Sequence, residues 1–242
     1  MKEIYYTIKG EGFPIFLLHG NGEDHHIFDK AVNILAEDYQ CICVDSRYHG
    51  KSVHQGELSY SQMQKDVMKI ADDLELEAYD VIGFSDGAIV ALLLGMNDSR
   101  LKHIVSLSAN TKPRYIKPLY RLTFYLQALC LLIFSIYQSK ARLSFRLYKL
   151  MLTQPHIAYE QLQEIKIPVL VLAGEFDMIK EIDTLKIGES LPYGIVKIIK
   201  HGNHFLLRDS FLETMQEITL FLKACHQEEQ YENMSNKTIE DR

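Results

Sequence analysis

A serine between two glycines is the clearest chemical feature of the sequence. Residues 83–87 read Gly-Phe-Ser-Asp-Gly, after a β-favouring run and before an apolar segment with helical spacing. A serine hydroxyl becomes a nucleophile when it is exposed, deprotonated by a neighbour and placed beside hydrogen-bond donors. A strand-to-helix turn exposes Ser85 and supplies one donor, and glycines at 83 and 87 remove side chains that would collide there. The pattern predicts a nucleophilic serine on a sharp turn.

Two later loops offer the base and the acid that such a serine needs. Glu175 and Asp177 follow one buried strand-like run, and His201 and His204 follow the next. A histidine on the last loop can reach the serine, and a carboxylate can fix its tautomer and orientation. The residues by themselves leave both choices open.

A glycine-rich segment ends the second apolar run, with the sequence His19-Gly20-Asn21-Gly22. Glycines at this place let backbone N–H groups point into a cavity, as binding of an oxyanion requires. His19 itself is expected to be a buried structural histidine.

Taken together, the Gly-Phe-Ser-Asp-Gly turn, the His-Gly segment and the chain order serine, acid, histidine resemble the α/β-hydrolase superfamily. The Ser-Asp pair in the turn is similar to that of hydrolases of the valacyclovir hydrolase type. The resemblance implies Asp177 as the acid, with Glu175 as the fallback, and His204 rather than His201 as the base. It also implies the backbone N–H groups of Asn21 and Asp86 as oxyanion donors, with Gly22 as the neighbouring candidate.

The loop at 45–52 resembles another motif of the same family, D-x-R-G-x-G-x-S, except that Tyr48 stands where glycine is usual. The departure makes the local turn geometry uncertain. Asp45 and Arg47 are expected to fix the loop as a hydrogen-bonded pair rather than to take part in chemistry.

The length and composition favour one α/β domain with an insertion. The chain has 242 residues, of which 47% are apolar. Repeated strand–helix units with nearly unbroken apolar strands predict a mostly parallel sheet covered on both faces, with a helical cap inserted before the acid-bearing strand. The expected divisions are a core at 1–111 and 166–226, a cap at 112–165 and a polar, disordered tail at 227–242.

The predicted cap is both apolar and basic. Residues 122–139 are uncharged and would form a helix of about 27 Å, close to the thickness of a bilayer core. A membrane span is disfavoured, because it would separate Ser85 from the strands that follow. The segment is instead expected to cover the active site, or to contact a second copy of the chain. Its basic residues could meet a membrane surface or an anionic substrate, or form a solvated face.

Other partners and cofactors are not expected. The net charge of −6 argues against nucleic acid. No secretory signal is visible, and the four cysteines are interpreted as buried thiols of a cytoplasmic protein. The remaining histidines show no metal-like pairing, so neither a metal nor a cofactor is expected.

The resemblance implies a serine hydrolase that cleaves a small ester, amide or thioester through an acyl-enzyme. Expected substrate contacts are Gly22, Phe84, Asp86, Phe124 and Phe205. The Asp86 carboxylate is either stabilised by the positive end of the helix dipole or pairs with an amine of the substrate. Alternatives on the same scaffold are C–C bond hydrolysis, lyase or haloperoxidase-like chemistry, and a non-catalytic receptor for a small molecule.

Overall fold

The computed structural model describes residues 4–240, and their side chains as far as 228. Seven strands form one sheet in the order β1-β3-β2-β4-β5-β6-β7, in which only β1 runs antiparallel to its neighbour. The strands are β1 (Tyr6–Lys9), β2 (Phe13–Leu18), β3 (Tyr39–Val44), β4 (Tyr79–Phe84), β5 (Leu101–Leu107), β6 (Val169–Gly174) and β7 (Gly194–Ile199). The predicted mostly parallel sheet is confirmed.

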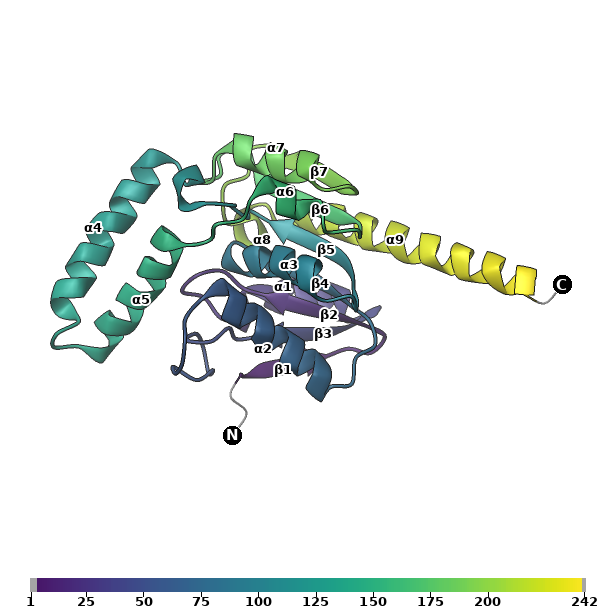
Figure 1. Cartoon of the computed structure of the whole chain (residues 1–242), viewed down its shortest axis with the longest axis horizontal. Coiled ribbons are helices and arrows are strands. Elements are labelled where there is room, and N and C mark those ends of the chain that lie inside the picture. Colours follow the sequence, from purple (N-terminus) through teal and green to yellow (C-terminus); the bar gives the residue numbers. More distant parts are fainter. Residues whose placement is uncertain (1–3, 241–242) are drawn as a thin grey trace.

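Helices cover both faces of the sheet (Figure 1). They are η1 (His25–Phe28), α1 (Asp29–Leu35), α2 (Tyr60–Asp73), α3 (Asp86–Asn97), η2 (Pro113–Tyr115), α4 (Pro118–Phe134), α5 (Ser139–Thr153), α6 (Tyr159–Leu162), α7 (Glu181–Ser190), α8 (Leu206–Asp209) and α9 (Phe211–Glu240). Side chains of α2, α3 and α7 pack on one face, and those of α1, α8 and α9 pack on the other. Alternate residues of each central strand enter opposite cores, which explains why these strands are almost uninterrupted in apolar residues.

The C-terminal segment differs from the expectation of a disordered tail from 227. Helix α9 continues to Glu240 instead of ending near 225. No glycine or proline occurs after Gly202, and Glu, Gln and Lys favour helix, so the local sequence gives the helix no reason to stop. Residues 241 and 242 lie outside the described part of the chain.

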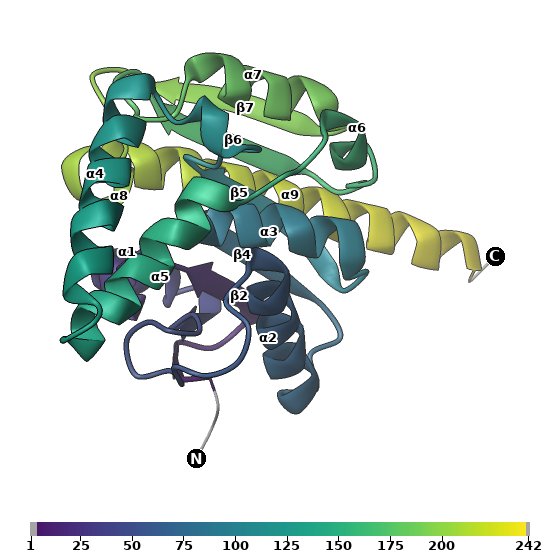
Figure 2. The ribbon, with the colours of Figure 1, turned by 60° about the vertical axis from the view of Figure 1, so that its left-hand side comes forward.

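The insertion between β5 and β6 contains the helical hairpin α4–α5, which projects from the sheet in two views (Figures 1 and 2). Helix α4 packs mainly against α5, and within it only Ala128 is buried. Cys130 is therefore exposed, contrary to the expectation of four buried thiols, whereas Cys41, Cys43 and Cys225 are buried.

Across residues 4–240, none of the helices combines the length and the apolar character needed to cross a bilayer.

Candidate active site

Ser85 occupies a strained turn between β4 and α3. Its backbone has φ 52° and ψ −111°, a combination that residues with a side chain rarely adopt. Its N–H donates to the carbonyl of Leu107 at 2.8 Å, which ties the turn to β5. A Cβ on Gly83 would collide with the carbonyl of Gly87, and a Cβ on Gly87 would collide with that of Leu18. Glycine at both positions is therefore required for this turn.

His204, in the loop after β7, connects Ser85 to Asp177. Its Nε2 lies 3.1 Å from Ser85 Oγ, and its Nδ1 lies 2.8 Å from Asp177 Oδ1. Because the Asp177 carboxylate accepts a hydrogen bond from Nδ1, that nitrogen carries the ring proton. Nε2 is then left to accept a proton from the serine hydroxyl. Burial opposes ionisation of Asp177, but His204 and hydrogen bonds from Ile179 N–H and the Ser108 hydroxyl outweigh it and hold the pKa of Asp177 below its usual value.

The two alternative residues lie together, away from this triad. Glu175 Oε2 accepts a hydrogen bond from the backbone N–H of His201 at 2.9 Å and lies 3.7 Å from His201 Nδ1. The His201 side chain is 87% exposed and the Glu175 side chain is 44% exposed. The geometry therefore separates one acid–histidine pair at Ser85 from a second pair at the surface.

Two backbone N–H groups flank Ser85 without an internal partner. Within residues 4–240, no acceptor is hydrogen-bonded to the N–H of Asn21 or of Asp86. The N–H of Gly22, the neighbouring candidate, instead donates to His49 Nε2 at 3.0 Å. An unpaired N–H can bind a developing oxyanion, so the arrangement suits Asn21 and Asp86 better than Gly22.

The Asp86 side chain is not placed as the amine-binding hypothesis requires. The residue is only 5% exposed and does not line the cavity at Ser85. Its two carboxylate oxygens accept hydrogen bonds from Asn21 Nδ2 at 2.9 Å and from the Tyr60 hydroxyl at 2.8 Å. Burial raises the pKa of Asp86, although these two hydrogen bonds oppose the rise. The carboxylate thus orients Asn21, and its burial outside the cavity keeps it from a substrate amine.

Two buried histidines hold the loops beneath Asn21. His19 Nδ1 donates to the carbonyl of Gly20 at 2.7 Å, and Nε2 accepts from the N–H of Ser46 at 3.0 Å. Burial lowers the pKa of His19 to about 4, and burial also lowers the pKa of His49. Protonated His19 would point a second donor at an N–H group, so only the neutral ring fits here. The expectation of a structural role for His19 agrees with these contacts.

The loop after β3 is fixed by other partners than those expected. Arg47 makes two hydrogen bonds of 2.6 Å to Asp66, whereas Asp45 accepts from the backbone and ring of His25 and does not pair with Arg47. Tyr48 adopts the left-handed conformation, with φ 67°, and its hydroxyl donates to the carbonyl of Gly56 at 2.7 Å. The side chain anchors a turn that glycine would otherwise make.

The cavity at Ser85 has a volume of about 360 Å³ and is bounded by both core and hairpin. Gly22, Phe84, Phe124 and Phe205 line it, as expected, and Asp86 does not.

Helix α5 supplies one wall of this cavity, which was not predicted from the sequence. The residues are Ser144, Leu147, Tyr148 and Met151. Their spacing of three, four and seven residues marks one face of a helix, so the signal was present in the sequence. The sequence did not show that this face of the helix lies towards the cavity at Ser85.

Glu23 is the second omission, and among the described residues no other Asp, Glu, Lys or Arg lines this cavity. It lines the cavity, and its Oε2 accepts from the N–H of Gly20 at 3.0 Å. Burial raises the pKa of Glu23, although that hydrogen bond opposes the rise.

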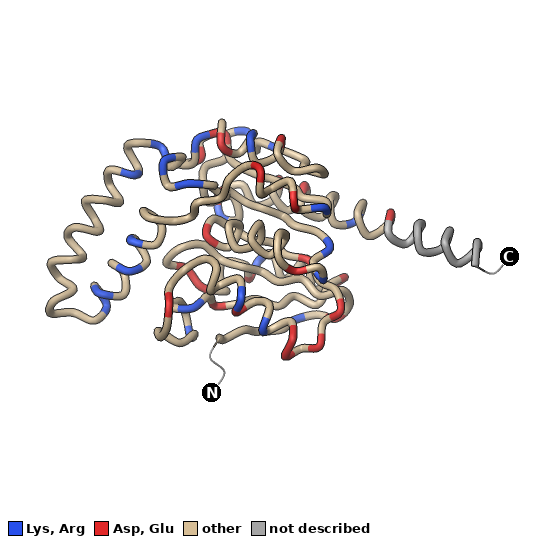
Figure 3. Tube along the Cα trace, viewed as in Figure 1, with Lys and Arg blue, Asp and Glu red and all other residues tan. Residues whose placement is uncertain are grey.

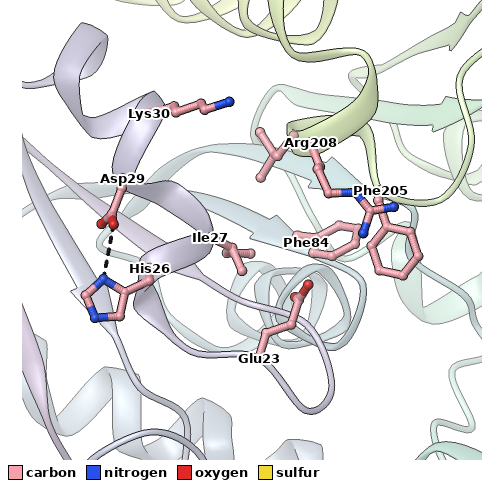
Figure 4. Close-up of a pocket in the computed structure, with 9 residues that line it drawn as sticks. Glu23, His26, Ile27, Asp29, Lys30, Phe84, Phe205 and Arg208 are labelled. Carbon is pink, nitrogen blue, oxygen red and sulfur yellow. Dashed lines mark hydrogen bonds and ion pairs between the residues drawn. The ribbon is translucent and has the colours of Figure 1, made fainter.

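A second cavity of about 360 Å³ shares Glu23, Phe84 and Phe205 with the first (Figure 4). Figure 4 shows Lys30 on the α1 side and Arg208 on the α8 side of this space. Arg208 makes hydrogen bonds of 2.7 and 2.9 Å to Asp209, so its charge is already paired.

The prediction of no metal-like pairing among the other histidines was wrong. Asp80, His103 and His226 place one potential ligand atom each within 4.8 Å of one another, as do the adjacent Asp24, His25 and His26. In the first group, Asp80 accepts from His103 Nδ1 and His226 Nε2, each at 2.8 Å. The group thus joins α9 to β4 and β5, a contact between distant segments that sequence spacing does not show.

The sequence of residues 14–145 matches the model of a family described as alpha/beta hydrolase fold. The chain belongs to this family. A crystal structure of bromoperoxidase from Bacillus anthracis shares the fold, with a TM-score of 0.78 at 21% identity, covering 91% of this chain and 95% of that one.

Two curated relatives match a shorter region. The chain is 31% identical over 105 residues to the magnesium-chelatase 30 kDa subunit of Rhodobacter capsulatus, covering 43% of this chain and 37% of the relative. It is 32% identical over 97 residues to 3-oxoadipate enol-lactonase 1 of Acinetobacter baylyi, covering 39% and 36%. The chain thus spans little more than a third of the length of these relatives.

Proposed function

We propose that the protein is a serine hydrolase of carboxylic esters. The observation that carries this proposal is the hydrogen-bonded chain from Asp177 through His204 to Ser85. The unpaired backbone N–H groups of Asn21, which lines the same cavity, and of Asp86, the residue after Ser85, support it. Acyl transfer needs a nucleophile, a base, an acid that orients the base, and hydrogen-bond donors for the oxyanion.

In the proposed reaction, Ser85 Oγ attacks the ester carbonyl while His204 Nε2 takes the hydroxyl proton. The N–H groups of Asn21 and Asp86 bind the oxyanion of the tetrahedral intermediate. Asp177 stabilises the imidazolium, which then protonates the leaving alcohol. Water repeats the sequence on the acyl-enzyme, and the carboxylic acid leaves.

The walls of the cavity support an apolar substrate. Phe84, Phe124, Leu147 and Met151 surround Ser85, and such surfaces bind an acyl or alkyl group by removing it from water. The name of the enol-lactonase relative supports an ester, because a lactone is a cyclic ester. The bromoperoxidase that shares the fold keeps a different reaction on this scaffold as the alternative.

The test is labelling by a serine-reactive alkyl phosphonate, with hydrolysis of a short p-nitrophenyl ester followed in parallel. We expect stoichiometric labelling of Ser85, identified by peptide mapping, together with loss of esterase activity. Ser85→Ala should be unlabelled and inactive, and Ser144→Ala, which removes another serine of the same cavity, should remain labelled. Labelling of a different serine, or no turnover of esters by the folded wild type, would contradict the proposal.

A further inference from the structure

The outer face of α4 is an apolar surface without a partner in this chain. Its residues recur every three or four positions and are each between 54% and 72% exposed: Leu119, Leu122, Leu126, Leu129 and Ile133. Tyr125, Leu132 and Phe134 widen the same surface. Large exposed apolar patches on a protein surface mark sites of interaction with a partner or a membrane.

The hairpin that carries this surface is basic, with its Lys and Arg residues before and at the start of α4 and on α5. Between 112 and 159 the chain has eight Lys and Arg residues and no Asp or Glu, although its overall net charge is −6. They are Lys112, Arg114, Lys117, Arg121, Lys140, Arg142, Arg146 and Lys149. Figure 3 shows blue segments at the two ends of α4 and along α5. The hairpin therefore combines an apolar face with a basic border.

We propose that the α4–α5 hairpin docks on an anionic membrane surface, with α4 lying in the plane of the interface. An apolar helix face flanked by Lys and Arg gains from both acyl chains and anionic headgroups. A second copy of the chain fits less well, because pairing two hairpins would bring the same positive charges together. The inner face of α4 is held by α5, so only the outer face is available to lipid.

The hairpin also connects this surface to Ser85. An open groove of about 580 Å³ is lined by Leu126, Cys130 and Phe134, and it shares Ser144 and Tyr148 with the cavity that contains Ser85. An apolar chain drawn from the membrane could lie in this groove while its ester reaches the serine. The substrate class that follows, and that rests on the proposed function, is a membrane-partitioning ester with a long acyl or alkyl chain.

Docking can be measured with a tryptophan, because the chain contains none. Leu129→Trp places the probe on the outer face of α4, and Leu220→Trp places it on α9 at nearly the same exposure, 56% against 58%. We expect a blue-shifted emission for Leu129→Trp with vesicles of phosphatidylcholine and phosphatidylglycerol in equal parts. Vesicles of phosphatidylcholine alone should give much weaker binding, and Leu220→Trp should not shift with either.

The role of charge has a matched control. Lys140→Gln with Lys149→Gln should weaken binding to the anionic vesicles roughly tenfold, and added salt should reduce the difference. Lys65→Gln with Lys69→Gln removes the same charge from exposed positions on α2 and should leave binding unchanged. Equal loss in both pairs, or no vesicle-induced shift at all, would overturn docking through the hairpin. So would a blue shift of Leu129→Trp without lipid, accompanied by a doubled mass in sedimentation equilibrium, since that result identifies a second copy.

The substrate class is tested separately from the proposed function. Leu122→Glu with Ile133→Glu should reduce hydrolysis of a long-chain ester in anionic vesicles at least tenfold, with hydrolysis of a short, water-soluble ester unchanged. Equal rates for variant and wild type on the vesicle substrate would overturn this substrate class. Failure of the wild type on the short ester would instead contradict the proposed hydrolase, while the tryptophan shift would still decide docking.

Discussion

Helices α3 and α4 are both built almost entirely from apolar residues, yet they are buried to opposite extents. Helix α3 follows Ser85 and has eight buried residues in its twelve, whereas α4 is five residues longer and has one. The sheet and α2 cover α3, while α4 packs mainly against α5. Apolar composition therefore predicts that a helix needs a packing partner, and the fold decides whether the chain itself supplies that partner.

The largest expected effect concerns the chemistry held by α3. Ser85→Ala should lower kcat for a short ester by roughly 10⁴-fold or more, because the nucleophile is lost. Leu129→Glu on α4 should leave that kcat within about twofold. The rates are measured at saturating substrate, with circular dichroism as the check on folding. Comparable losses in both variants would break the division between catalytic core and docking surface.

The same contrast should be visible in stability. Leu92, fully buried on α3, should destabilise the fold by about 2–5 kcal/mol when changed to alanine, because the change leaves a cavity. Leu129→Ala should change the free energy of unfolding by less than about 0.5 kcal/mol, since its side chain is exposed. Urea denaturation without lipid measures both values. A large effect at Leu129 would mean that α4 is already covered in solution.

Acid should weaken the core through His19. Burial lowers the pKa of His19 from 6.5 to about 4, so between these values the unfolded chain binds more protons than the folded one. The stability of the fold is therefore unaffected by His19 titration above pH 6.5. As pH falls towards 4, the free energy of unfolding decreases, by about 2 kcal/mol between pH 7 and pH 5. His19→Gln should show a correspondingly smaller loss over this interval in urea titrations. His26→Gln, at an exposed site, should retain the wild-type dependence.

The smallest effect should come from the contact that orients Asn21. Asp86→Ala leaves the Tyr60 hydroxyl without its acceptor and leaves the Asn21 amide with the carbonyl of Leu147, at 3.2 Å, as its remaining partner. We expect kcat to fall about tenfold with a smaller change in KM. Asp86→Asn should recover most of the loss, because its carbonyl can accept from Asn21 while its amide donates to Tyr60. Failure of this rescue would show that the negative charge is needed.

Local sequence predicted much of the site. Glycine at 83 and 87 marked a turn that no larger residue can make, and the collisions with the carbonyls of Gly87 and Leu18 give the reason. Apolar runs marked the buried strands because a strand covered on both faces has no polar side. These signals located the loops that carry Ser85, Asp177 and His204, whereas the choice of Asp177 over Glu175 and of His204 over His201 rested on the resemblance to α/β-hydrolases.

Tertiary structure decided which side chains meet. The Asp86 carboxylate accepts hydrogen bonds from Asn21 and Tyr60 and does not line the cavity. Arg47 pairs with Asp66 and not with Asp45. These pairs are distant in sequence, and nothing in residue type distinguishes one carboxylate partner from another. The exposure of the outer face of α4 is likewise decided by tertiary packing. The sequence shows that this face is apolar, but only the packing of α5 and the core shows that no other part of the described chain covers it.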